Sequence, residues 1–92
     1  MHAVVVTVSV EQNQLEAARK ALKEQVVPRV RGSKGFLKGY WTAGADQTQG
    51  LSLVVFDSEQ NARDAANMVR ANPTPPGVTL RNVEVREVIA DA

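Results

Sequence analysis

The chain has 92 residues, a formal net charge of +1 and no cysteine. Without cysteine, disulfides, zinc–thiolate sites and thiol nucleophiles are excluded. The basic residues are scattered rather than gathered into the stripe typical of nucleic-acid-binding proteins. Hydrophobic residues make up 43% and charged residues 23% of the chain, which is ordinary for a folded protein. We therefore predict a single domain over residues 1–92, with no nucleic-acid partner and no metal.

The beginning of the chain lacks the basic lead and the cleavage site of a signal peptide. Every apolar run is far shorter than the roughly 20 residues that a membrane-spanning helix needs. We therefore predict a cytoplasmic protein with no membrane partner.

The first predicted strand runs from Ala3 to Val10. Its core face is made of valines, whereas the opposite face is small and semi-polar, as suits a surface covered by a partner. Ser9 followed by Gln12 resembles a capping box, so a helix is expected to begin near Val10 or Glu11. The four core-face residues are Val4, Val6, Val8 and Val10.

The first predicted helix carries an apolar stripe at spacings of three and four residues. Pro28 cannot donate a hydrogen bond to Glu24, and it should kink or end this helix. A glycine-containing loop over residues 32–35 follows. The stripe consists of Leu15, Ala18, Leu22 and Val26.

A hairpin follows the first helix. Residues 36–43 and 51–56 read as strands, and the polar stretch 44–50 forms the turn between them, so the two strands are antiparallel. Both faces of the second of these strands are apolar. A sheet that is apolar on both faces needs a partner on the face that its helices leave open.

The second predicted helix begins at a capping-box-like pair, Asp57 with Gln60, and runs to about Ala71. Its buried side is expected to hold Ala62, Ala65 or Ala66, and Val69. A proline-rich connector over residues 73–77 leads into the last strand, residues 78–89.

The order of these elements is the βαββαβ pattern of a ferredoxin-like α+β fold. It predicts a four-stranded antiparallel sheet with two helices on one face. Two copies packed sheet to sheet would cover the open face, so we expect a homodimer.

The sequence also resembles a known family, the dimeric α+β barrel superfamily, and within it the antibiotic-biosynthesis monooxygenase-like domains. The resemblance covers nearly the whole chain. It implies a homodimer with a pocket in each subunit, and activities such as cofactor-independent oxidation of phenols or quinols. It is carried by the valine-rich first strand, by Gly35-Phe36 before Gly39-Tyr40-Trp41, and by Val54–Ser58 before Asn61-Ala62.

The same superfamily includes haem-degrading enzymes. These use an asparagine in the first strand, a tryptophan near the end of the third strand and an iron-ligating histidine. The first position falls at Val6 or Thr7 and the second at or near Phe56, and no histidine follows His2. Haem degradation is therefore an alternative that lacks its marker residues.

Tyr40 and Trp41 are the main candidates for a ligand pocket. One of them would line the pocket and stack on a flat aromatic ligand. The competing interpretation places one in the core and the other in the dimer interface. Because neighbouring strand residues point to opposite faces, at most one of the two faces a given pocket.

The remaining candidates are His2, Thr7, Ser9 and Phe56. His2 is the only side chain that ordinarily titrates near neutral pH, and it would serve as a general base, but chain termini fray. The Thr7 and Ser9 hydroxyls would orient a ligand hydroxyl. No histidine lies near either of them in sequence to activate it as a nucleophile.

Two hypotheses remain open. In the first, the chain is a small-molecule-binding domain resembling cofactor-independent monooxygenases, with a phenol or quinol in the pocket and no cofactor. In the second, it is a non-catalytic binding or assembly module whose pocket is filled by its own side chains. A cavity of about 300 Å³ or more with convergent polar groups would favour the first.

Overall fold

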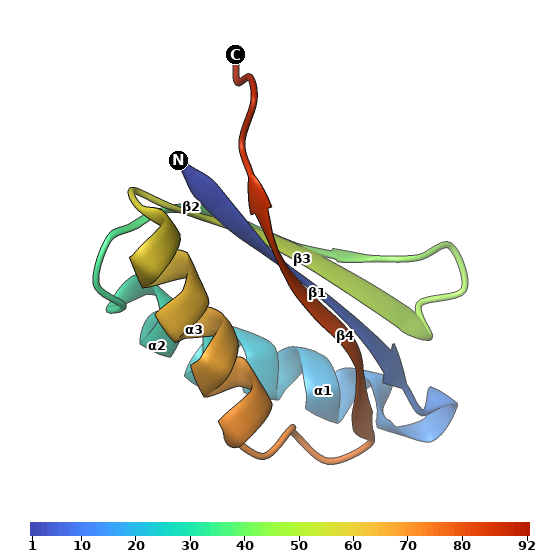
Figure 1. Ribbon diagram of the computed structural model, residues 1–92. Helices are drawn as coiled ribbons and strands as arrows, with labels where there is room; N and C mark the ends of the chain where they lie inside the picture. Colours follow the sequence, from blue (N-terminus) through green and yellow to red (C-terminus); the bar gives the residue numbers. More distant parts are fainter.

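The computed structural model describes residues 1–92 and shows one twisted sheet with helices on a single face (Figure 1). All neighbouring strands are antiparallel, in the order β2-β3-β1-β4. The predicted βαββαβ order and the four-stranded sheet are therefore confirmed. The prediction of one domain over residues 1–92 stays a prediction. The strands are β1 His2–Val10, β2 Phe36–Ala43, β3 Gln49–Phe56 and β4 Val78–Glu87.

The central strands β1 and β3 carry the core. Val4 pairs with Val54 across the two strands, and Val54 lies on the same face of β3 as Phe56. All three side chains are buried. The valine face of β1 is thus correctly predicted as the face turned toward the helices.

Helix α3, Glu59–Ala71, packs directly on this core. Ala62 and Ala66 are fully buried, and their small side chains let the helix backbone approach the sheet closely. Asn72, which precedes a proline, ends the helix at the predicted position.

The cap of α3 differs from the prediction by one residue. The backbone N–H of Asn61 donates to the Ser58 hydroxyl over 3.2 Å, and Ser58 has the extended backbone of an N-cap. Asp57 instead accepts a hydrogen bond from the Asn61 side-chain amide, and Gln60 donates to Asp64. The Asp57–Gln60 capping box was therefore wrong, although a helix does begin there.

The first helical segment consists of four consecutive pieces. A wide π-helical turn interrupts it, in which the N–H of Val27 donates to the Leu22 carbonyl five residues earlier. Pro28 explains this turn, because its ring excludes an ordinary hydrogen bond to the residue four positions before it. Instead of ending the helix, Pro28 is followed by another turn. The pieces are η1 Gln12–Gln14, α1 Leu15–Ala21, η2 Leu22–Val26 and α2 Val27–Arg31.

The predicted Ser9–Gln12 capping box is wrong. The residue before the first helical turn is Glu11, and no side chain caps it. The Ser9 hydroxyl accepts a hydrogen bond of 2.7 Å from Nε of Arg81 on β4. Ser9 therefore ties two strands together instead of starting a helix.

Candidate functional site

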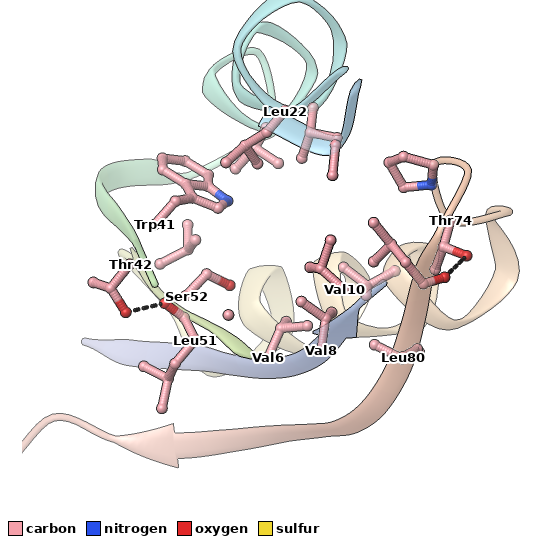
Figure 2. A pocket seen from close by; sticks show the side chains of 18 of the residues that line it. Val6, Val8, Val10, Leu22, Trp41, Thr42, Leu51, Ser52, Thr74 and Leu80 are labelled. Atoms are coloured by element: carbon pink, nitrogen blue, oxygen red, sulfur yellow. Dashed lines mark hydrogen bonds between the residues drawn. The ribbon is translucent and has the colours of Figure 1, made fainter. Parts of the chain in front are cut away.

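The main cavity lies between the helix-facing side of the sheet and the first helical segment, and its volume is about 450 Å³. Figure 2 shows Val6, Val8 and Val10 along one wall and Leu22 on the opposite wall. The predicted apolar stripe of the first helix thus faces a cavity rather than packing tightly on the sheet.

The cavity is open because the first helical segment lies farther from the sheet than α3 does. Helix α3 contacts β1, β3 and β4, whereas the pieces of the first helical segment mainly contact one another. Ala65 and Val69 of α3 therefore line the cavity beside the buried alanines of the same helix. The proline-rich connector, including Thr74, closes the end near β4 (Figure 2).

Trp41 resolves the choice between the two neighbouring aromatic residues, because it lines the cavity. Its indole lies over Gly39, where a Cβ would come within 2.8 Å of the ring carbon Cη2. The indole nitrogen is directed toward the cavity (Figure 2), and no protein acceptor bonds to it. Trp41 thus offers an apolar ring and a free N–H donor.

Ser52 is the cross-strand partner of Trp41 and also of Val6. Its side chain lines the cavity, and its hydroxyl makes no hydrogen bond within the protein (Figure 2). Cross-strand partners have Cβ atoms about 5 Å apart, so the two polar groups can meet one ligand atom. The sequence analysis missed Ser52, although it is the one hydroxyl on a strand face that also holds Val54 and Phe56.

Three of the predicted pocket residues lie on the other face of the sheet. Tyr40 is 55% exposed and carries the Lys38 ammonium 5.6 Å from its ring centre. Thr7 borders a separate hollow of about 170 Å³, and Ser9 bonds to Arg81. None of the three lines the main cavity, because strand alternation turns them away from the helices.

The last two predicted pocket residues lie on the helix side of the sheet. Phe56 is 1% exposed and forms the innermost wall of the cavity, packed edge-on against Phe36. His2 is paired between Phe56 and Glu87 at the end of β1 and does not line the cavity. Its buried Nδ1 has no hydrogen-bond partner. The role of His2 as a general base therefore stays a prediction, and the cavity gives it no support.

The charged residues around the cavity are all cations. Arg19, Lys23 and Arg29 of the first helical segment line it, and no aspartate, glutamate, histidine or tyrosine does. The two ion pairs of the structure lie elsewhere, on α3 and on β4. These three cations were not among the predicted site residues.

The rim of the cavity is bridged by one hydrogen bond from the helix to the β2–β3 turn. The Arg19 guanidinium donates to the side-chain carbonyl of Gln47 over 2.8 Å. Gln47 has a φ of 65°, which is uncommon for a residue other than glycine. Asp46 holds this turn by accepting from the Thr48 N–H, and the hydrogen bond lowers the pKa of the Asp46 carboxyl below its ordinary value.

No group of three or more histidine, aspartate or glutamate side chains gathers in a way that would hold a metal ion. No helix is both long enough and apolar enough to cross a membrane. The cytoplasmic location stays a prediction.

Comparison with known proteins shows similarity of structure only. No protein-family model matches the sequence, and no curated protein sequence matches it. The haem degrader MhuD from Mycobacterium tuberculosis, solved with two haems in its active site, superposes with a TM-score of 0.77 at 16% identity, over 100% of this chain and 99% of that one.

Two further structures are similar. One is described as a candidate antibiotic biosynthesis monooxygenase from Deinococcus radiodurans, with a TM-score of 0.70 at 16% identity over 100% of this chain and 96% of that one. The other is the ActVA-Orf6 monooxygenase of Streptomyces coelicolor in complex with the ligand nanaomycin D. It has a TM-score of 0.60 at 19% identity over 99% of this chain and 92% of that one.

These similarities define the class of fold. The chain has a ferredoxin-like fold, and its structural neighbours include a haem degrader and proteins described as monooxygenases. The resemblance inferred from the sequence is therefore confirmed at the level of fold. At these identities the comparison does not carry an activity to this chain.

Proposed function

We propose that this protein binds a flat, largely apolar small molecule in the cavity beneath its first helical segment. The observation that carries this proposal is the cavity of about 450 Å³, which has the size and the mainly apolar lining of small-molecule sites. It exceeds the volume of about 300 Å³ set as the discriminator between the two hypotheses.

The polar groups in the cavity suit a ligand with an oxygen atom. The Trp41 N–H is a donor only, and the Ser52 hydroxyl can donate or accept. A phenol, quinol or quinone oxygen placed between them would satisfy both groups. The indole and the Phe56 ring would supply apolar contact to the rest of the ligand.

The catalytic form of this proposal is cofactor-independent oxidation of a phenol or quinol by molecular oxygen. When a phenol is oxidised to a quinone, a ring C–H becomes a carbonyl and the phenol O–H loses its proton; one oxygen atom of O₂ enters the product, the other leaves as water, and the substrate supplies all four electrons. Because no lining side chain is a general base near neutral pH, the chain would act by positioning the ionised substrate and excluding water.

The alternatives have less support from the cavity. An open cavity argues against a non-catalytic module with a filled core. It is compatible with a non-catalytic binding protein. For haem degradation, no histidine lines the cavity.

The first experiment is titration with phenylnaphthylamine, an uncharged aromatic probe. Trp41 is the only tryptophan, so its emission reports on the cavity directly. We expect saturable quenching that Val8→Phe weakens, because the larger ring enters the cavity. Thr79→Phe, an exposed position on β4, is the control and should leave binding unchanged. Binding that survives Val8→Phe undiminished would refute the site.

The second experiment tests catalysis separately. Oxygen uptake is followed with a panel of phenols and quinols that quench Trp41. Trp41→Phe removes the N–H donor and keeps an aromatic ring, so it should slow oxidation more than it weakens binding. Tyr40→Phe, on the opposite face, should change neither. If the ligands bind but no oxygen is consumed, the proposal of a binding protein is kept and the proposal of a monooxygenase is refuted.

We further propose that the chain forms a homodimer through the sheet face opposite the helices. Leu51 and Leu53 are 47% and 39% exposed there, next to Thr7 and Val5 on β1. Tyr40 pairs with Leu53 and extends the same surface. Isolated soluble domains rarely leave such a surface open, and a second copy offers a matching one.

The dimer is tested by light scattering after size-exclusion chromatography. We expect twice the chain mass, and Leu53→Asp should shift it to the monomer, because it would bury two unpaired charges. Arg63→Asp on the exposed side of α3 is the control and should remain dimeric. A wild-type monomer at micromolar concentration would refute the interface.

A further inference from the structure

Among the charged residues of the first helical segment, only cations line the cavity. The three that line it are positive, whereas Glu16 and Glu24 of the same segment do not line it. The whole chain has a net charge of only +1, so this local excess of +3 does not reflect a generally basic protein.

Arg19 is the cation most directly placed at the rim. Its guanidinium bonds over 2.8 Å to Gln47, a neutral amide whose backbone has a positive φ. Gln47 accepts this hydrogen bond without bringing a negative charge, whereas an anion would accept from the same guanidinium and add Coulomb attraction to it. An anion at the rim would therefore displace Gln47 as the partner of Arg19.

Lys23 stands one helical turn after Arg19 on the same side of the helix. Both side chains border the cavity, and neither forms an ion pair. A single acidic group at the rim can therefore meet two positive charges, while the body of the ligand lies against the apolar walls.

We propose that the natural ligand is an aromatic acid, whose carboxylate or equivalent anionic group binds Arg19 and Lys23 at the rim. This inference rests on the proposed function, since it names the chemical class of the molecule that the cavity takes. The aromatic end lies toward Trp41 and Phe56, and Gln47 holds Arg19 in place until the ligand arrives.

The test compares two probes with the same ring system. Phenylnaphthylamine is uncharged, and anilinonaphthalene sulfonate carries one negative charge. Quenching of Trp41 gives the affinity for each. We expect the sulfonate to bind about tenfold more tightly than the neutral probe, and the preference to shrink as salt is added, since the rim cations are exposed.

Variants locate the source of the preference. Arg19→Gln should reduce it by roughly three- to tenfold and leave the neutral probe within about twofold of wild type. Arg19→Lys should retain part of it, and Lys23→Gln should lose part. The matched control is Lys20→Gln, a cation of the same helix that does not line the cavity.

The outcomes separate this inference from the proposal on which it rests. Equal affinities for the two probes, with Val8→Phe still weakening both, overturn the aromatic acid but keep the binding site. A preference that survives both Arg19→Gln and Lys23→Gln also overturns it. If neither probe binds, the proposed function fails, and the aromatic acid fails with it.

Discussion

Gly39→Ala should reshape the cavity at little cost in stability. The new methyl group would lie 2.8 Å from Cη2 and 2.9 Å from Cζ3 of the Trp41 ring, whereas ordinary contacts begin near 3.4 Å. The indole must therefore move away from the strand by several tenths of an ångström. Since open space rather than packed protein lies beyond it, the ring can move without displacing the core.

Two opposing terms set the expected stability of this variant. Replacing glycine by alanine in a strand removes backbone freedom from the unfolded chain and stabilises by about 0.5–1 kcal/mol. Forced displacement of a packed ring costs about 1–3 kcal/mol, and the low end applies where the ring has room to move. The free energy of unfolding should therefore change by no more than about 1 kcal/mol in either direction.

The affinity for a ligand, in contrast, should fall, because the displaced indole ring enters the space that the ligand occupies. Loss of about 1 kcal/mol of contact corresponds to roughly a fivefold weaker affinity for phenylnaphthylamine. The assays are the emission spectrum of Trp41, the probe titration and urea unfolding. Gly44→Ala is the matched control, because a Cβ there would meet only ordinary contacts of 3.7 Å or more.

The refuting result is specific. If Gly39→Ala leaves both the Trp41 emission and the probe affinity as they are in Gly44→Ala, the indole does not lie over Gly39. If the variant instead unfolds at much lower urea concentrations, the space beyond the ring is packed, and the cavity assignment fails.

Three further predictions concern the frame of the site. Ser58→Ala should destabilise the protein by about 1 kcal/mol in urea unfolding, because it removes the side-chain acceptor of the Asn61 N–H. The folded-state pKa of Asp46 is depressed, so the hydrogen bond from the Thr48 N–H to its carboxylate is fully formed above the ordinary pKa of 3.8. The bond is lost as the pH falls through the lower folded-state pKa. An NMR titration of the Thr48 amide should therefore show a midpoint below 3.8. In hydrogen exchange, amides of Leu15–Ala21 should exchange faster than those of α3, since that segment has few contacts with the sheet; equal protection would contradict a first helix held away from the sheet.

The order of the elements could be predicted from the sequence because the residues that end helices and form turns are easy to recognise. Pro73 and the preceding Asn72 end α3, and the polar stretch 44–50 separates two strands. The caps were harder to place, because serines, asparagines and aspartates crowd the same few positions. Ser58 and Asp57 are equally suitable N-caps by residue type, and only the backbone decides between them.

The choice between Tyr40 and Trp41 shows a second limit. Strand alternation predicts that the two side chains face opposite sides of the sheet. It does not tell which of the two sides faces the helices, because that depends on how the strand pairs with its neighbours. Here the pairing of β2 with β3 shifts between Phe36 and Lys38, which changes the count along the strand. Because both faces of β3 are apolar, the residues of β3 could not show which face of β2 is turned toward the helices.

The cavity itself could not be predicted, because its apolar stripe has the same pattern as a stripe that packs tightly. Leu15 and Leu22 meet the requirements of a core helix by their spacing alone. What separates the two outcomes is the distance of the helix from the sheet. That distance depends on which residues lie between the layers.

Two cations of the first helical segment are consistent with a helix that stands away from the sheet. A helix seated on a core would hold cations such as Arg19 and Lys23 on the solvent side. Both of them border the space beneath the helix instead. In a filled interface they would be buried beside apolar side chains without partners, at a cost of several kcal/mol each. They are tolerated because the space is open at its rim, and the same openness leaves them free to meet an acidic ligand.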